Sequence, residues 1–213
     1  MKTQYDTAAT PDVPSPIDFL NADDARAWTE TAMQRPFRED FFSAFASQLL
    51  QLGKPSLCVL ELGAGPGFLA HYLLARIPAL HIKLLDYSPA MHALARERLQ
   101  EFPSRVAHVE RSFRDADWSV GLGTHDAVIT NQAVHELRHK RHAVTLHRQV
   151  PSLLAPGGLY LVADHYCAAD AMQNDQLYMT LDEQGEALRA AGFQAEQMLV
   201  LGGRALWRAI QDQ

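Results

Sequence analysis

The sequence predicts an α/β fold, a doubly wound and mostly parallel sheet of seven strands with a C-terminal antiparallel hairpin. Short apolar runs alternate with helical patterns between residues 57 and 164, as they do in repeated strand–helix units. Glycines at alternate positions between residues 63 and 67 follow the first apolar run and precede a helical pattern. Near the C-terminus, Gly202-Gly203 separates two further strand-like segments, which indicates a hairpin.

The residues before this alternation predict an N-terminal helical arm. Three prolines among small polar residues indicate that residues 1–16 are loosely ordered. An asparagine suited to N-capping starts a predicted helix over residues 21–34, and a strong apolar stripe predicts a second helix over residues 37–52. We therefore divide the chain into an arm with its helices, residues 1–52, and a sheet domain, residues 53–213.

Within the sheet domain, caps and glycines mark where the elements begin and end. Ser88 followed by Pro89 is typical of a helix N-terminus, and Thr180-x-x-Glu183 forms a capping box. The predicted helices lie at 67–76, 89–101, 136 or 140 to 154, and 181–191. The predicted strands lie at 57–62, 81–86, 105–111, 126–130, 159–164, 194–201 and 204–210.

The composition limits the partners and metals that we expect. The formal net charge of −6 predicts no general attraction to nucleic acid. No apolar run approaches the roughly 20 residues of a membrane span, and the first residues lack a signal-peptide pattern, so we expect a cytoplasmic protein without a membrane partner. Two cysteines give no disulfide framework, and Cys58, in the first predicted strand, is expected to be buried. The spacing of His135, His139 and His142 differs from the zinc-protease helix motif, and no metal site is predicted.

The glycine-rich turn predicts a ligand site. Glycines tolerate positive φ and have no Cβ, so a ligand can lie against the backbone at the start of the following helix. A dinucleotide fingerprint, Gly-x-Gly-x-x-Gly, would place its third glycine where this chain has Phe68. Asp86 ends the second predicted strand about 20 residues after the glycines, where such a unit delivers a carboxylate to a ribose. In the alternative interpretation, the glycines serve packing alone and Asp86 only caps the helix that starts at Ser88.

These features together resemble a known family. The motif Glu61-x-Gly-x-Gly-x-Gly67 is similar to motif I of the class I S-adenosylmethionine-dependent methyltransferases. Residues 126–132 resemble the fourth strand of that family, and residues 154–162 resemble the segment that leads into its fifth strand. The resemblance covers residues 56–210. It implies the fold of the family, S-adenosylmethionine as the cofactor and S-adenosylhomocysteine as the product.

The resemblance also implies a set of cofactor-binding residues. Asp86 would accept hydrogen bonds from the ribose hydroxyls, Glu61 would anchor the glycine turn or the amino group of the methionine moiety, and Asn131 would contribute its backbone carbonyl. The family often has an acid near the adenine amino group, but this position falls on Ser112, and Asp115 would have to substitute. The implied residues are Glu61, Gly63, Ala64, Gly65, Gly67, Asp86, Tyr87, Met91, Ser112, Phe113, Asn131 and Gln132.

Candidate catalytic residues follow the fourth and fifth predicted strands. In a doubly wound sheet, the ligand crevice lies at the carboxyl ends of the strands, and these ends supply His135, Asp164 and His165. Because a histidine titrates near neutrality, His135 is the best candidate for a general base, oriented by Glu136 or Asp164. For both histidines, a purely structural hydrogen bond is the alternative.

The sequence therefore predicts a methyltransferase that acts on an oxygen, nitrogen or carbon atom of a small molecule, as a monomer or homodimer. Methyl transfer from a sulfonium needs a base only when the acceptor arrives protonated or is a poor nucleophile. Two alternatives are a partner or regulatory protein that binds S-adenosylmethionine without transferring its methyl group, and an NAD-dependent oxidoreductase, which Phe68 and the hairpin argue against. The arm and residues 166–180 are expected to cover the acceptor site, with walls from Trp28, Phe37, Phe41, Tyr166, Tyr178 and Met179.

Overall fold

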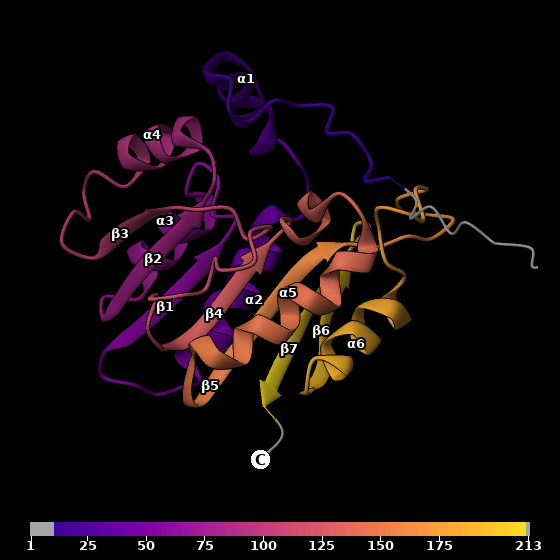
Figure 1. Cartoon of the computed structure of the whole chain (residues 1–213). Coiled ribbons are helices and arrows are strands. Elements are labelled where there is room, and N and C mark those ends of the chain that lie inside the picture. Colours follow the sequence, from indigo (N-terminus) through magenta and orange to yellow (C-terminus); the bar gives the residue numbers. More distant parts are fainter. Residues whose placement is uncertain (1–10, 212–213) are drawn as a thin grey trace, which may run out of the picture.

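The computed structural model describes residues 11–211, which form a seven-stranded sheet between two layers of helices (Figure 1). The strand order is β3-β2-β1-β4-β5-β7-β6. The first five strands of the chain pair in parallel, and β7 runs antiparallel between β5 and β6. The predicted doubly wound sheet with a C-terminal hairpin is confirmed. Part of the loosely ordered arm that we predicted lies outside the described residues.

Most predicted elements are found with small shifts in their ends. The strands are β1 (Leu57–Leu62), β2 (Leu80–Asp86), β3 (Val106–Glu110), β4 (His125–Asn131), β5 (Leu154–His165), β6 (Phe193–Leu201) and β7 (Arg204–Gln211). The α-helices are α1 (Ala22–Ala32), α2 (Arg38–Leu50), α3 (Phe68–Arg76), α4 (Pro89–Arg98), α5 (Ala143–Gln149) and α6 (Leu181–Ala190). The side chains of Asn21, Ser88 and Thr180 each accept backbone N–H groups at a helix start, as predicted.

The helix predicted from residue 136 or 140 to residue 154 is wrong as a single element. The chain instead forms three short 3₁₀ segments around α5, namely η1 (Val134–Leu137), η2 (Lys140–His142) and η3 (Val150–Leu153). Arg138 has a φ of 66°, a left-handed conformation that a continuous right-handed helix cannot contain. This break turns the chain after η1 and places His135 and Glu136 at the carboxyl ends of the strands.

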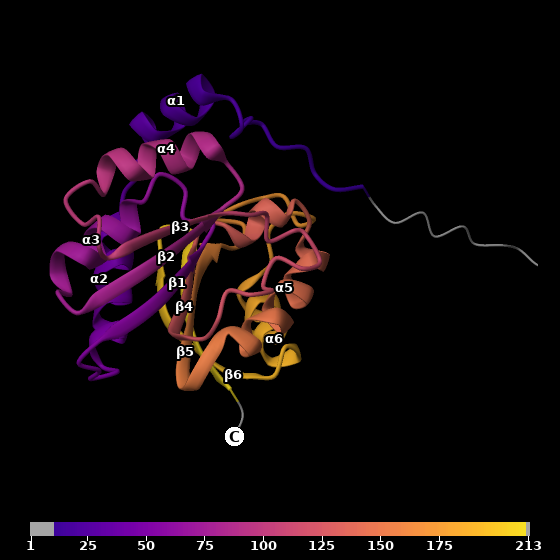
Figure 2. The ribbon, with the colours of Figure 1, turned by 60° about the vertical axis from the view of Figure 1, so that its left-hand side comes forward.

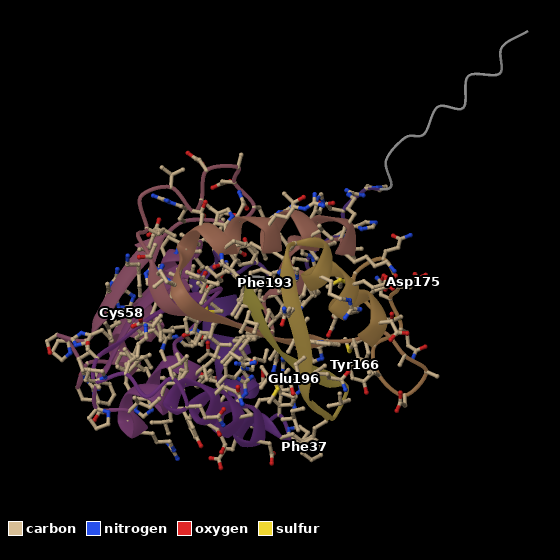
Figure 3. All side chains as sticks on the ribbon, turned by 90° about the horizontal axis from the view of Figure 1, so that it is seen from below. Phe37, Cys58, Tyr166, Asp175, Phe193 and Glu196 are labelled. Carbon is tan, nitrogen blue, oxygen red and sulfur yellow. The ribbon has the colours of Figure 1, made fainter. Side chains whose placement is uncertain are left out.

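The expectation that Cys58 is buried is also wrong, because its side chain is exposed (Figure 3). Cys58 is the second residue of β1 and pairs with His81 of β2, which is exposed as well. Neither helix layer covers this end of the sheet on that side. The last four residues of β1 are all buried.

Two apolar cores hold the helices on opposite faces of the sheet (Figure 2). One core joins α2, α3 and α4 to the sheet, and the other joins α5, η3 and α6 to it. Helix α1 packs on α4 beyond the sheet. The carboxyl ends of β1, β2, β4 and β5 therefore meet at one edge, next to α1 and the arm. Within residues 11–211, no helix combines the length and apolar character that crossing a membrane requires.

Candidate active site

A cavity of about 650 Å³ lies at the carboxyl ends of the parallel strands. Its walls also include residues 13–17 of the arm, Trp28 of α1, and side chains between Met172 and Tyr178. The predicted site residues that line it are Gly63, Gly65, Asp86, Tyr87, Met91, Ser112, Phe113, Gln132, His135 and His165. An adjoining pocket of about 60 Å³ shares Gly63, Gly65 and Gln132 with this cavity, and adds Glu61, Ala64 and Asn131 from the predicted set. Of the predicted site residues, only Gly67 and Asp164 line neither space.

The glycine turn is held by hydrogen bonds to β2 and by close backbone packing. The Gly63 N–H donates to the Leu85 carbonyl at 2.8 Å, and a Cβ at Gly63 would lie 2.4 Å from the Ala133 Cβ. A Cβ at Gly65 would meet no protein atom within 4 Å, so this glycine presents bare backbone to the cavity. Gly67 lines neither space, and its missing Cβ lets Ala95 and Leu99 approach the turn, so its contact with the ligand stays a prediction.

Asp86 joins the glycine turn to α4 at the edge of the cavity. One carboxylate oxygen accepts the Gly65 N–H at 2.8 Å, and the other accepts the Ser88 N–H at 2.9 Å. The side chain is buried, and this burial raises the pKa of Asp86 in spite of the two bonds. Asp86 therefore holds Ser88, the residue that caps α4. Its remaining lone pairs are available to a ligand in the cavity, because a carboxylate accepts up to about four hydrogen bonds.

Three buried polar atoms have no hydrogen-bond partner within the described part of the chain. They are Oε2 of Glu61, Oδ1 of Asn131 and Nε of Arg38, and all three residues line the smaller pocket. Leaving such a group unpaired costs about 1–3 kcal/mol, so three at one place indicate a binding site for a polar ligand. Two acceptors and one donor complement an ammonium group beside a carboxylate. Burial, and to a lesser degree the charge of Asp86, raises the pKa of Glu61 to about 8.

Arg38 lies in a group of cations that favours a negatively charged ligand group. Its guanidinium stacks on the ring of Phe68 at 5.3 Å and is almost fully buried. Burial, and then the charges of Arg35, Arg204 and Arg98, lower the pKa of Arg38 to about 10. An anion beside these four side chains would relieve their mutual repulsion.

His135 and Asp164 meet at the end of β5, as the sequence predicts. The carboxylate of Asp164 lies 2.7 Å from Nδ1 of His135 and accepts the backbone N–H groups of His135 and His165 at 2.8 Å and 2.7 Å. On the other side of the ring, Nε2 of His135 lies 3.3 Å from a carboxylate oxygen of Glu136. Burial disfavours charge on this histidine, but the two carboxylates outweigh it and raise the pKa of His135 to about 10. Both ring nitrogens therefore carry hydrogen at neutral pH.

His165 and Tyr178 complete an aromatic cluster around His135. The three ring centroids lie 5.5–6.0 Å apart, and all three residues line the main cavity. Burial lowers the pKa of His165 to about 4, with Asp164 opposing the effect and His135 and Arg204 adding to it. His165 is therefore a neutral ring at neutral pH. The cluster combines one cationic and one neutral histidine beside the glycine turn.

The His135 pair predicts a pH dependence of stability. A pKa raised in the folded state stabilises the fold fully below the ordinary value of 6.5, and this contribution is lost as the pH rises through about 10. Between pH 7 and pH 10, the free energy of unfolding of the wild type should therefore fall more steeply than that of His135→Gln, by up to about 1.4 kcal/mol per pH unit. Chemical denaturation at several pH values measures both slopes. The other titratable groups that contact the ring, namely Asp164, Glu136, His165 and Tyr178, are present in both proteins, and equal slopes would contradict the charged state of His135.

Several expected walls of the acceptor site lie elsewhere. Trp28 and Tyr178 line the cavity, whereas the predicted walls Phe37, Phe41, Tyr166 and Met179 do not. Phe37 is partly exposed and packs against Gly202 at the hairpin turn, which is why a Cβ at Gly202 would collide with its ring. Asp115, the expected substitute near the adenine, does not line the cavity either. That adenine contact therefore has no acidic candidate after β3.

Residues of the arm and of the first two helices contribute more than the sequence indicated. Asp12 binds Arg114 at 2.7 Å and also pairs with Arg141 and His142. The Arg138 guanidinium donates to the carbonyls of Val13 and Pro14, at 2.9 Å and 2.6 Å, so the arm is held across the cavity. Arg35 and Arg38 reach the site from either side of the α1–α2 turn. No local motif marks these five arginines, because each acts through contacts between distant segments.

Comparison with known proteins shows that the chain is similar to methyltransferases. Residues 59–158 match the family described as methyltransferase domain. Trans-aconitate 2-methyltransferase of Mycobacterium tuberculosis is 38% identical over 100 residues, which cover 46% of this chain and 33% of that protein. An O-methyltransferase family protein from Burkholderia thailandensis has a TM-score of 0.75 at 21% identity, covering 91% of this chain and 61% of that chain. DhpI, solved in complex with S-adenosylhomocysteine, has a TM-score of 0.66 at 21% identity, covering 89% of this chain and 94% of that chain.

The chain has the fold of the class I S-adenosylmethionine-dependent methyltransferases, whose cofactor is S-adenosylmethionine, and its residues 59–158 match the methyltransferase-domain family. It spans 5% to 61% of the length of the first curated relatives that it matches. The site fits this cofactor, because the unpaired groups of Glu61, Asn131 and Arg38 complement the amino and carboxyl groups of a methionine moiety. The open side of Gly65 and the carboxylate of Asp86 lie in the adjoining cavity, where a nucleoside would follow.

Proposed function

We propose that this chain transfers the methyl group of S-adenosylmethionine to a small-molecule acceptor that binds in the main cavity. The observation that carries the proposal is the set of three unpaired buried groups beside the glycine turn, which suits the zwitterionic end of this cofactor. Its sulfonium supplies an electrophilic methyl group, so the protein has to hold the acceptor close to it in a pocket without bulk water.

Each residue has a defined part in this proposal. Glu61, Asn131 and Arg38 bind the methionine end, Gly63, Ala64 and Gly65 leave room for it, and Asp86 binds the ribose. Tyr87, Met91, Ser112, Phe113 and Gln132 enclose the rest of the nucleoside, and His135, Asp164 and His165 face or support the acceptor. The acceptor is a small molecule methylated at oxygen, nitrogen or carbon. A structural neighbour named as an O-methyltransferase supports oxygen, and a relative named for trans-aconitate supports a small-molecule acceptor.

Calorimetric titration tests the cofactor site. S-adenosylhomocysteine should bind to the wild type and NAD should not, whereas binding of NAD alone would reject the proposal. S-adenosylhomocysteine formed from S-adenosylmethionine in the presence of candidate acceptors then separates a transferase from a protein that only binds the cofactor.

Replacing Asp86 with alanine should weaken S-adenosylhomocysteine binding by about 1–3 kcal/mol, because charge-assisted hydrogen bonds to the ribose are lost. Asp115→Ala is the matched control, since this aspartate follows the neighbouring strand but lies outside the cavity. Titration of both variants gives the two affinities. An unchanged affinity in Asp86→Ala, or an equal loss in Asp115→Ala, would remove Asp86 from the site.

A further inference from the structure

We infer that the methyl acceptor is a small carboxylic acid that binds as its anion, that Arg35 anchors the carboxylate, and that a carboxylate oxygen receives the methyl group. This inference rests on the proposed function and names its substrate class. It follows from the pairing of the charged groups around the main cavity, from the state of its histidines, and from the character of its walls.

Arg35 is the one arginine of the cavity wall without an acidic partner among residues 11–211. Three arginines line the cavity, namely Arg35, Arg114 and Arg138. Arg114 pairs with Asp12 at 2.7 Å, and Arg138 pairs with Glu136 at 3.3 Å while also holding the arm. The guanidinium of Arg35 instead lies over the ring of Trp28, 5.3 Å from its centroid. Arg35 is exposed, and a guanidinium that lies over an aromatic wall presents a planar pair of donors that matches a carboxylate.

The acidic groups of the cavity do not oppose an anion near Arg35. The two carboxylates that line the cavity are those of Asp86 and Glu136. Asp86 is engaged by the N–H groups of Gly65 and Ser88, and Glu136 lies between Arg138 and the ring of His135. The charge of Arg35 is felt at His165 and Tyr178, on the acceptor side of the cavity, as well as at Arg38.

Neither histidine of the cavity is suited to removing a proton from the acceptor. Both ring nitrogens of His135 face carboxylates, at 2.7 Å and 3.3 Å, so neither has a free lone pair for a substrate. His165 is neutral, and its lowered pKa makes it a weak base. An alcohol or phenol would need such a base, whereas a carboxylic acid is already ionised at neutral pH.

The transfer step needs no other reactant. A carboxylate oxygen forms a bond to the methyl carbon while the bond from that carbon to sulfur breaks, and the electron pair of this bond stays on sulfur. The negative charge of the acceptor and the positive charge of the sulfonium cancel, giving a methyl ester and a neutral thioether. No proton is released.

Titration of small ligands into the protein saturated with S-adenosylhomocysteine tests this inference. Benzoate and benzamide are a suitable pair, since they have nearly the same shape and differ in charge, and the cavity has aromatic walls. Benzoate should bind roughly 10- to 100-fold more tightly than benzamide to the wild type, as expected for a charge-assisted pair. Arg35→Gln should abolish this preference, and Arg35→Lys should keep part of it. Arg26→Gln is the matched control, because this arginine of α1 is exposed and outside the cavity.

The affinity for S-adenosylhomocysteine, measured for every variant, separates the two levels of the hypothesis. If the wild type does not bind S-adenosylhomocysteine, the proposed function fails. If the wild type binds it but does not prefer benzoate to benzamide, only the inference of an acid acceptor fails. A preference that survives in Arg35→Gln, or is lost equally in Arg26→Gln, would also overturn the role of Arg35. With acids that bind, methyl groups transferred from labelled S-adenosylmethionine should be released by mild alkali as methanol. Label that is stable to alkali would mean transfer to another atom.

Discussion

Replacing Asp164 with asparagine should lower the free energy of unfolding by about 3–5 kcal/mol, the usual cost of removing one partner of a buried ion pair. Asp164 is buried and accepts hydrogen bonds from the ring and backbone of His135 and from the backbone of His165. Asparagine offers an NH₂ group in place of one carboxylate oxygen, so at least one of these donors would face another donor. Urea unfolding of both proteins at neutral pH measures the loss.

A double-mutant cycle separates the ion pair from the rest of the site. In the His135→Gln background there is no imidazolium to leave unpaired, so Asp164→Asn should cost clearly less than in the wild type. The remaining cost reports the two backbone N–H groups. If Asp164→Asn costs the same in both backgrounds, the charged pair is not the source of the stability.

Replacing Gly63 with alanine should destabilise the fold by about 2–5 kcal/mol. The φ of 66° costs a residue with a side chain about 1–2 kcal/mol, and the contact with Ala133 at 2.4 Å adds about 1–3 kcal/mol of overpacking. Thermal or chemical unfolding without ligand measures the effect.

Gly65→Ala is the matched control for this change. It should cost less stability than Gly63→Ala and should mainly weaken cofactor binding. Gly65 has a φ of 54°, but a Cβ there meets no protein atom within 4 Å, so only the backbone cost of about 1–2 kcal/mol applies. The new methyl group would instead enter the space proposed for the cofactor and weaken S-adenosylhomocysteine binding roughly tenfold or more. Equal stability losses in the two variants would contradict the different surroundings of these glycines.

The sequence predicts the fold well because the deciding signals are local. Apolar runs, capping residues and the glycine turn each depend on neighbours within a few positions, and Asn21, Ser88 and Thr180 act as predicted. The meeting of His135 with Asp164 could also be predicted, because parallel strands bring their carboxyl ends to one edge.

Other features depend on contacts that no local pattern records. From the sequence, an arginine at a helix start such as Arg38 is expected to be solvated. In the structure, Arg38 is buried and lines the same pocket as Glu61, next to the glycine turn. Glu136 is the neighbour of His135 in the sequence, yet its effect on the ring requires the bend at Arg138. Gly67 fits the motif but serves the contact with α4, and this follows from the structure alone.

The unpaired carboxyl group of Glu61 links cofactor occupancy to proton exchange with the solvent. With a pKa of about 8, this group is mostly protonated at neutral pH when no ligand is near. An arriving ammonium group would favour the ionised form, so a proton would leave the protein as the cofactor enters. The measured heat of association would then vary with the ionisation enthalpy of the buffer, and affinity would rise with pH until Glu61 is already ionised in the free protein.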